Sequence, residues 1–287
     1  MLRGYLELLR PPNVVTAIAD VLAGYAVAGR ANAVALPWLI GSTVCLYAGG
    51  VVLNDYFDRH LDAAERPERP IPSGRVPAAA AATLGSALLG AGVLCATQAT
   101  RTAFGVAAAI AVAVVLYDAR AKRHSLAGPL TMGLCRGLNL LLGVSAVPAA
   151  LSGRWPIAVL SVVYIAAVTA VSRGEVHGGR SRTATLALVS LCAVMTALAA
   201  LAIRTASGRI AAFVVIGALA YRVLPPFWRP VKDPRPMTIR HAVRAGVLSL
   251  VLVDAAIGAA YAGPAYAAVV LGIGLVATSL ASLFSVT

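Results

Sequence analysis

Ten long apolar runs separated by short polar gaps dominate this 287-residue sequence. A helix that crosses a bilayer needs about 20 predominantly apolar residues. Only 12% of the residues are charged, about half the share of roughly 25% found in soluble domains, so a water-soluble globule is excluded. The runs are 14–29, 35–53, 78–98, 102–117, 127–150, 156–171, 184–203, 209–224, 241–261 and 264–285. They predict one all-α domain over residues 1–287, a polytopic membrane bundle of nine or ten helices.

The basic residues give the chain its formal net charge of +13 and indicate its orientation. A nucleic-acid interface would cluster them with stacking aromatic residues, whereas here they lie in the gaps between apolar runs. If the N-terminus is cytoplasmic, 18 of the 24 Lys and Arg residues fall on the cytoplasmic side and five on the other. Basic loops stay cytoplasmic. We therefore expect membrane lipid and no nucleic acid as a partner, with the N-terminus and the long loops in the cytoplasm, in a bacterial inner membrane.

Four of the cytoplasmic gaps are long and polar and contain Gly or Pro. They are 54–77, 118–126, 172–183 and 225–240. Loops of this kind tend to carry function, so we expect the active side to face the cytoplasm. Polar loops follow the second and the sixth apolar run, four runs apart, which suggests two similar four-helix halves.

The sharpest motif is the acidic stretch 54–62, NDYFDRHLD. If the second helix continues through it, Asp55, Asp58 and Asp62 fall at i, i+3 and i+7 and line one face together with Asn54. The three carboxylates repel one another, and the helix dipole disfavours anions at a C-terminal end. A helix end with these costs is typical of a cation site. Oxygen ligands suit Mg²⁺, which is often shared with substrate phosphates.

An alternative is an ordinary solvated helix end in which Asp55 pairs with Arg59 and Asp62 with Arg66, both at i, i+4. The next stretch, RPERPIPSGR at 66–75, favours a site instead. Its prolines and glycine form a rigid loop that would hold Arg69 and Arg75 close to the carboxylates. A bound phosphate would complete the charge balance there.

The pattern NDxxDxxxD followed by R-P-x-x-S-G-R resembles the first signature of the UbiA superfamily of intramembrane prenyltransferases. It is matched by Asn54, Asp55, Asp58, Asp62, Arg69, Pro70, Ser73, Gly74 and Arg75. Arg10-Pro11-Pro12-Asn13, Tyr117 and Lys122 extend the resemblance over about residues 5–225. It implies helices around a central cavity, an isoprenyl diphosphate bound through Mg²⁺ by two Asp-rich motifs, and transfer of the prenyl group to a lipophilic acceptor, often aromatic.

The second motif departs from the superfamily pattern, which usually has a DxxxD-type pair. Here residues 172–179 read SRGEVHGG, and Glu175 is the one carboxylate. This string resembles a divergent branch that includes the EboC-like proteins. Arg173 and His177 could contact the diphosphate, and His177 could instead ligate metal, accept a proton or stand in solvent.

Ionising an allylic diphosphate places negative charge on the leaving group, which metal ions and cationic side chains stabilise. The metal ligands implied by the resemblance are Asn54, Asp55, Asp58, Asp62 and Glu175. The catalytic residues are Asp58, Asp62, Tyr117 and Glu175. The diphosphate-binding residues are Arg69, Arg75, Lys122, Arg123, Arg173 and His177.

Two acids, Asp20 and Asp254, lie inside apolar runs, where an unpaired carboxylate is costly. Arg136, in the fifth run, is the expected partner for a structural ion pair. The alternative is that Asp20 lines the cavity and takes a proton from the acceptor or steadies the carbocation. Tyr25 and Tyr164 are further candidates for the cavity wall, because aromatic faces stabilise cations.

Three functions remain open at this stage. The first is an Mg²⁺-dependent intramembrane prenyltransferase. The second is a terpene cyclase on the same scaffold, in which ring closure follows ionisation and no acceptor is needed. The third is a non-catalytic carrier or scaffold that binds a lipid diphosphate, which the reduced second motif would permit.

Overall fold

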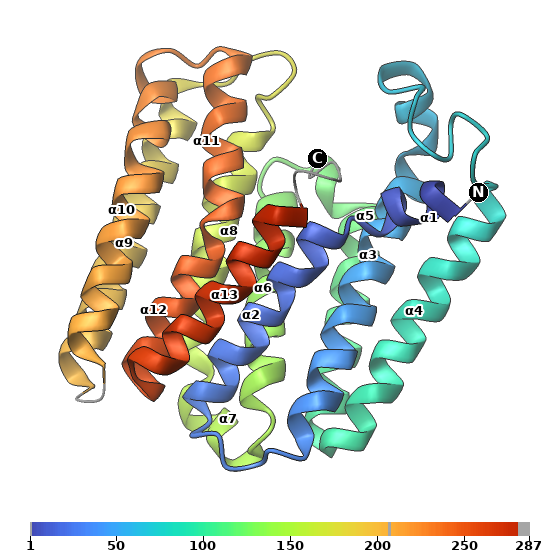
Figure 1. The fold of residues 1–287 in the computed structure, drawn as a ribbon. Helices are drawn as coiled ribbons and strands as arrows, with labels where there is room; N and C mark the ends of the chain where they lie inside the picture. Colours follow the sequence, from blue (N-terminus) through green and yellow to red (C-terminus); the bar gives the residue numbers. More distant parts are fainter. Residues whose placement is uncertain (1, 206–207, 281–287) are drawn as a thin grey trace.

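The computed structural model describes residues 2–205 and 208–280, and the regular secondary structure of these residues is entirely helical (Figure 1). The α-helices are α1 (Leu2–Leu9), α2 (Pro11–Val27), α3 (Ala35–Glu65), α4 (Ala78–Ala99), α5 (Arg101–Ala119), α6 (Ala127–Val144), α7 (Pro148–Arg154), α8 (Ala158–Ser172), α9 (Ser181–Arg204), α10 (Arg209–Lys232), α11 (Pro236–Leu248), α12 (Leu250–Ala262) and α13 (Pro264–Leu280). Two 3₁₀ turns, η1 (Ala121–Arg123) and η2 (Trp155–Ile157), complete them.

Each predicted apolar run coincides with one helix or with two consecutive helices, which confirms the all-α membrane bundle. Seven helical stretches in the described ranges are long and apolar enough to cross a membrane. α2, α6 and α13, with 17, 18 and 17 residues, are not among them. The exact count of nine or ten crossing helices is therefore not confirmed. Residues 281–285 of the last predicted run lie outside the described residues.

Proline marks the start of several helices. α2, α7, α11 and α13 each begin at a proline, where the missing N–H is not needed and the fixed φ angle already suits a helix. Gly263, with φ of 88°, ends α12 and allows the chain to turn directly into α13. The boundaries of these helices thus follow from local sequence.

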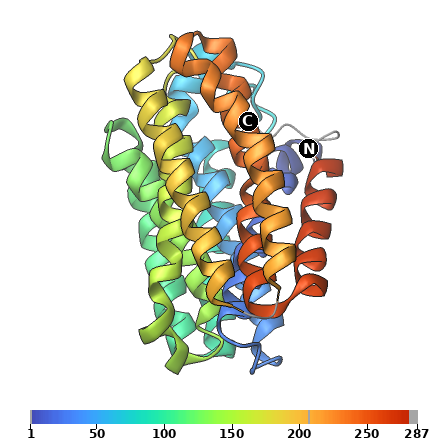
Figure 2. The ribbon, with the colours of Figure 1, turned by 90° about the vertical axis from the view of Figure 1, so that its left-hand side faces the viewer.

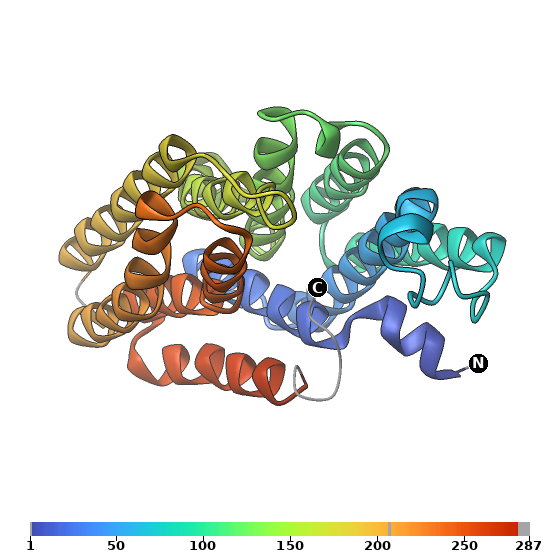
Figure 3. The ribbon, with the colours of Figure 1, turned by 90° about the horizontal axis from the view of Figure 1, so that it is seen from above.

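The helices run side by side, and the functional loops gather at one end of the bundle. The C-terminal end of α3 and the α8–α9 and α10–α11 connections stand at the top of Figure 1, and the turned view places them at the same end (Figure 2). Seen from that end, α2 lies between the group formed by α3 and α4 and the group formed by α8 to α11 (Figure 3). The prediction that two four-helix halves resemble each other stays a prediction.

α2 and α6 cross in backbone contact. A Cβ atom on Gly24 would lie 1.9 Å from the carbonyl oxygen of Leu140, and one on Gly143 would lie 2.1 Å from that of Val21. Small residues allow such an approach between membrane helices, where packing and polar contacts replace the hydrophobic effect. The crossing brings Asp20 on α2 against the polar residues of α6.

Candidate active site at the polar end of the bundle

The acidic motif forms the last three turns of α3, and the structure divides it between two edges of that helix. Asp55 and Asp62 are seven residues apart, about 20° short of two full turns, so they share one edge. Asn54 and Asp58, one turn apart, form the other edge and face α5 and η1. The expectation of a single face is therefore corrected: the spread of about 100° between Asn54 and Asp55 gives the two edges different partners.

The edge that carries Asp55 and Asp62 is buried and bound by two arginines. Arg10 Nη2 donates to Asp55 Oδ1 at 2.5 Å. Arg69 Nη1 lies 2.8 Å from Asp62 Oδ2 and 3.4 Å from Asp55 Oδ1, so it bridges both carboxylates. The alternative i, i+4 pairs with Arg59 and Arg66 are not what the structure shows, because partners from other segments replace them.

The edge that carries Asn54 and Asp58 is more open. Lys122 Nζ lies 2.7 Å from Asp58 Oδ1, and the Asp58 side chain is 25% exposed. Asn54 Nδ2 donates to Asp118 Oδ1 at 2.8 Å, which leaves the amide oxygen of Asn54 available. Tyr117 stands beside Asp118 at the end of α5 and is half-buried. Oxygen donors from α3 and α5 therefore meet at the end of the bundle, next to a lysine.

Local backbone geometry holds Arg10 in place. Its φ is 45°, in the left-handed region that a non-glycine residue rarely adopts. The following proline disfavours the right-handed helical conformation at this residue, so α1 ends here and α2 begins in a new direction. The turn aims the Arg10 side chain at Asp55.

The loop after α3 turns at its glycine and is closed by a backbone hydrogen bond. Gly74 has φ of 74°, and the Val76 N–H donates to the Pro70 carbonyl at 2.9 Å. Arg75 Nη1 donates to Glu7 Oε2 on α1 at 2.6 Å, so it ties the loop to the N-terminal helix. The loop thus brings Arg69 to the carboxylates, whereas Arg75 is directed to α1.

The loop of residues 173–180 between α8 and α9, called the Gly-rich loop below, contacts two other segments. Arg173 donates to the carbonyl oxygens of Lys122, Arg123 and His124 at 2.9, 3.3 and 3.4 Å. Arg240 Nε donates to the Glu175 carbonyl at 3.0 Å. Burial raises the pKa of the Glu175 carboxyl, while the nearby Arg66 and Arg240 guanidinium groups oppose this shift.

Four of the predicted diphosphate ligands are exposed, namely Arg75, Arg123, Arg173 and His177, whereas Arg69 and Lys122 are half-buried. Arg123 lies in η1, and His177 lies in the Gly-rich loop.

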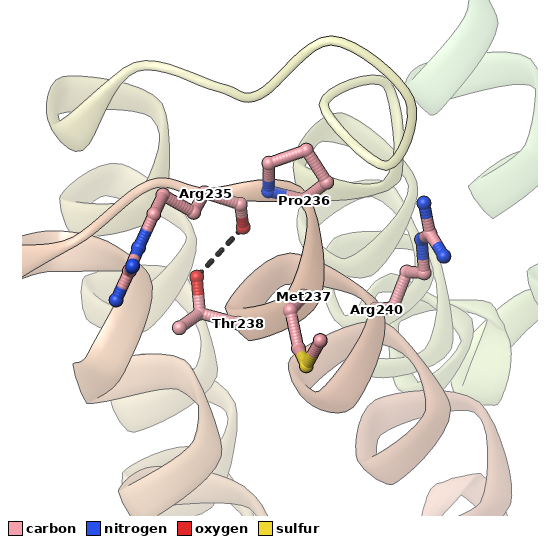
Figure 4. Close-up of a pocket in the computed structure, with 5 residues that line it drawn as sticks. All are labelled: Arg235, Pro236, Met237, Thr238 and Arg240. Atoms are coloured by element: carbon pink, nitrogen blue, oxygen red, sulfur yellow. Dashed lines mark hydrogen bonds between the residues drawn. The ribbon is translucent and has the colours of Figure 1, made fainter.

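A surface groove opens at the start of α11. It is lined by Arg235, Pro236, Met237, Thr238 and Arg240 (Figure 4). Thr238 Oγ1 donates to the Arg235 carbonyl at 2.7 Å, which closes the first turn of the helix. Arg240 projects on the other side of the groove, toward the Gly-rich loop that it binds.

A second depression lies on α5 and is lined by Ala111, Val112, Val115, Leu116, Ala119 and Arg120. Neither encloses the acidic motif, so the central cavity stays a prediction.

The residues at the end of α3 include oxygen donors of the kind that bind Mg²⁺. Across residues 2–205 and 208–280, no three His, Cys, Asp or Glu side chains converge closely enough to hold a metal ion. Asn54, Asp58 and Asp118 nevertheless supply the hard oxygen donors that Mg²⁺ prefers, and Mg²⁺ usually completes its shell with water and phosphate oxygens. These residues fit such an ion. Glu175, by contrast, lies among arginines of other segments.

Tyr25 and Tyr164 are both buried, and each hydroxyl group donates a hydrogen bond to a backbone carbonyl group. Tyr25 donates to the Arg30 carbonyl at 2.9 Å, near the end of α2 opposite to the acidic motif. Tyr164 donates to the Gly246 carbonyl at 2.9 Å within the largest apolar cluster. Their place on a cavity wall stays a prediction.

The buried acid Asp20 has the partner that the sequence predicts. Arg136 Nε lies 3.1 Å from Asp20 Oδ2, and Asn139 Nδ2 donates to the same oxygen at 2.7 Å. Asn139 in turn accepts from Thr43 Oγ1 on α3 at 2.6 Å. Asp254 on α12 is fully buried and interacts electrostatically with Asp20 and Arg136. The cluster therefore joins four helices inside the bundle.

Sequence reasoning missed two residues of the site, Arg10 as a partner of Asp55 and Asp118 as a partner of Asn54. A signal for Asp118 was available, because it stands one turn before Lys122 at the end of an apolar run. The signal for Arg10 was weaker: it stands directly before the Pro-Pro pair that begins α2.

The comparison with protein families decides the assignment. The model of the UbiA prenyltransferase family matches residues 15–235, which include both polar motifs and most of the helices. The chain belongs to this family. The resemblance carried by the acidic motif and the following loop is thereby confirmed at the level of the UbiA superfamily.

The curated proteins that are similar in sequence to this UbiA-family chain include several digeranylgeranylglyceryl phosphate synthases. The protein of Ignicoccus hospitalis is 39% identical over 142 residues, 50% of this chain and 46% of that protein. The protein of Methanoregula boonei is 31% identical over 202 residues, 70% of this chain and 72% of that protein. The chain spans about half the length of the first curated relatives that it matches. These relatives are archaeal, so they give no support to the expectation of a bacterial inner membrane.

Solved structures share the fold. A digeranylgeranylglyceryl phosphate synthase structure superposes with a TM-score of 0.68 at 21% identity, covering 91% of this chain and 98% of that one. A UbiA homologue from Archaeoglobus fulgidus, bound to DMAPP and Mg²⁺, gives a TM-score of 0.57 at 17% identity and covers 96% and 99%. At these identities the likeness establishes the fold. The family match and the seven long apolar helical stretches of the described residues support an integral, multi-pass membrane protein.

Proposed function

We propose that this protein is an Mg²⁺-dependent intramembrane prenyltransferase that ionises an isoprenyl diphosphate and transfers the prenyl group to a lipophilic acceptor. One observation carries the proposal: Asp58 with Lys122, and Asn54 with Asp118, form a polar cluster at the end of α3, flanked by Arg10 and Arg69. Family membership supports the same chemistry.

Asn54 and Asp58 are the residues that would hold Mg²⁺. Asp58 is the most accessible carboxylate of the motif, and its ion pair with Lys122 can open toward an incoming charge. Asp55 and Asp62 are already neutralised by buried arginines, which suits them to fixing the loop. When bound, Mg²⁺ supplies charge neutralisation to the diphosphate oxygens. The wider predicted set, with Asp55, Asp62 and Glu175 as ligands, stays a prediction.

In the proposed reaction the bond between C1 of the prenyl group and the diphosphate oxygen breaks, and its electron pair leaves with the diphosphate. Lys122 and Arg69, which pair with carboxylates of the acidic motif, would stabilise this negative charge as it develops. An oxygen or carbon of the acceptor then attacks the allylic cation, and the acceptor releases a proton. Apolar helices around the prenyl tail would keep water from capturing the cation.

The relatives favour one class of acceptor. Their name describes a product with geranylgeranyl groups on glyceryl phosphate, which requires an acceptor hydroxyl on a phosphorylated lipid. We therefore propose a glyceryl-phosphate lipid in preference to the aromatic acceptor expected from sequence. The basic end of the bundle suits two phosphorylated substrates. It also supports a cytoplasmic position for the N-terminus and the active-site loops.

The test uses purified protein in lipid nanodiscs with Mg²⁺ and allylic diphosphates of several chain lengths. Each is offered with a glyceryl-phosphate lipid alcohol, with an aromatic acceptor or with no acceptor. Products are identified by mass, and diphosphate release is measured with and without a chelator. The proposal predicts chelator-sensitive release and a conjugate with the glyceryl-phosphate lipid.

Other outcomes would contradict the proposal in different ways. An aromatic conjugate would retain prenyl transfer and replace the acceptor. Cyclic hydrocarbons or alcohols formed without acceptor would identify a terpene cyclase, to which the relatives give no support. Binding of the diphosphate without its release would identify a carrier or scaffold.

A further inference from the structure

Arg173, directly after α8, directs its guanidinium group at the backbone of a distant loop. Nη1 donates to the carbonyl oxygen of Lys122 at 2.9 Å and more weakly to that of His124 at 3.4 Å, and Nη2 donates to that of Arg123 at 3.3 Å. Carbonyl groups at the end of a short helical turn lack partners within the turn. The planar guanidinium fork suits several acceptors at once, which an ammonium group on a flexible stem does not match.

The clamped backbone carries a side chain of the proposed active site. Lys122, the first residue held by Arg173, places its Nζ 2.7 Å from Asp58 Oδ1, and its side chain is only 13% exposed. The contacts therefore run from Arg173 to the carbonyl groups of residues 122–124, then through Lys122 to Asp58. Movement of this short loop would carry Lys122 away from the acidic motif.

The Gly-rich loop fixes Arg173 at its own end. A Cβ atom on Gly174 would lie 2.7 Å from Ile239 Cδ1 and 2.9 Å from Gly179, so the loop packs tightly against α11. The Gly179 N–H donates to the Pro234 carbonyl at 2.9 Å, which anchors the loop to the α10–α11 connection. Glycine is needed here because larger residues would hold the loop away from Ile239.

We propose that Arg173 is a positioning residue: it clamps the backbone at residues 122–124 so that Lys122 stays on Asp58 and faces the diphosphate. This inference rests on the proposed function and assigns the divergent second motif a role that needs no second pair of carboxylates. It also differs from the direct diphosphate contact that the sequence predicts for Arg173.

The first test is independent of turnover. The Lys122 and Arg123 carbonyl groups belong to two of the peptide bonds that trypsin cleaves in the α5–α6 connection, and cleavage requires local opening. In nanodiscs, Arg173→Ala should speed cleavage at these two bonds about tenfold, as expected for the loss of charge-assisted hydrogen bonds. Arg173→Lys should restore little protection. The control is Arg182→Ala, which removes an exposed arginine at the start of α9, and it should leave both rates unchanged.

The second test is a double-mutant cycle on diphosphate release. Arg173→Ala should lower kcat/KM about tenfold, and adding it to Lys122→Ala should change kcat/KM by less than about twofold, because the two residues act as one unit. Additive effects, together with retained activity in Arg173→Lys, would show direct contact with the diphosphate and overturn the proposal. So would unchanged cleavage rates in Arg173→Ala. If the wild-type protein shows no turnover, the proposed function is wrong. The cleavage rates would still test whether Arg173 holds the backbone at residues 122–124.

Discussion

At the end of α3, three carboxylates meet cations from other segments, whereas at the end of α8 a guanidinium group meets backbone carbonyl groups. In the first arrangement, a metal ion and a phosphate can replace the partners of the carboxylates and cations. In the second, the guanidinium group of Arg173 is already engaged in hydrogen bonds that hold a loop. Two polar loops at the same end of the bundle therefore contribute differently: the first supplies chemistry, and the second supplies position. The predictions below test this division, starting with the largest expected effect.

Asp58→Asn should lower diphosphate release by about two to three orders of magnitude, the usual cost of losing one group that stabilises developing charge. The measurement is the rate of release from an allylic diphosphate in the presence of Mg²⁺. Asp233→Asn is a matched control, because Asp233 pairs with Arg235 at the same end of the bundle but outside the motif. Release within twofold of wild type in Asp58→Asn would remove the metal assignment.

Arg69→Ala should lower the free energy of unfolding by about 3 kcal/mol, because it leaves two buried carboxylates short of a cation. The measurement is equilibrium unfolding in detergent micelles. Arg75→Ala offers the comparison: the Arg75 side chain is 42% exposed and that of its partner Glu7 is 24% exposed, so solvent screens this pair and we expect a loss below about 1 kcal/mol. Equal losses of unfolding free energy in Arg69→Ala and Arg75→Ala would contradict this prediction. They would mean that the burial of Asp55 and Asp62 does not increase the cost of removing their cation.

Gly174→Ala should destabilise the protein by about 1–3 kcal/mol, the usual cost of overpacking, since the new methyl group meets the Gly179 backbone as well as the Ile239 side chain. It should also speed tryptic cleavage in residues 120–124, because the loop that carries Arg173 is displaced. Gly153→Ala, where a Cβ atom meets nothing within 4 Å, is the control. A stable Gly174→Ala protein with unchanged cleavage would show that the loop does not depend on this contact.

Glu175→Gln should leave diphosphate release within about threefold of wild type, because Glu175 lies near Arg66 and Arg240, neither of which contacts Asp58 in the ion pairs of the site. It should alter the pH dependence of stability. Burial raises the pKa of this carboxyl, so the folded state holds the proton more tightly than the unfolded chain. Wild type should therefore lose thermal stability as pH rises above the ordinary range of glutamate, and Glu175→Gln should not. A loss of activity comparable to that of Asp58→Asn would instead support Glu175 as a metal ligand.

His177→Ala should change turnover by less than about twofold, since the side chain is exposed in the Gly-rich loop. The measurement is steady-state release over a range of diphosphate concentrations. A tenfold rise in KM would instead identify His177 as a diphosphate ligand.

The bundle and its first motif could be predicted from sequence because both depend on local patterns. Apolar runs predict helices, and the Pro-rich stretch predicts the rigid loop that brings Arg69 to the carboxylates. Arg136 was found as the partner of Asp20 because an intramembrane acid restricts its partners so severely.

The remaining contacts depend on tertiary packing that periodicity does not specify. Nothing in the spacing of Asn54 and Asp118 shows that α3 and α5 place them 2.8 Å apart. Likewise, an arginine beside a predicted phosphate site is expected to bind phosphate, and only the packing of the Gly-rich loop on α11 turns Arg173 toward carbonyl groups.

The charged cluster inside the bundle has a consequence for how the chain enters the bilayer. Asp20 belongs to one of the first helices to be made, yet its contact Asn139 follows 119 residues later, and Asp254 is added later still. Until α6 arrives, α2 would expose a lone acid to hydrocarbon. The early helices therefore gain their final depth and mutual placement only once synthesis has passed the middle of the chain, and truncation before α6 should leave an N-terminal fragment that inserts poorly.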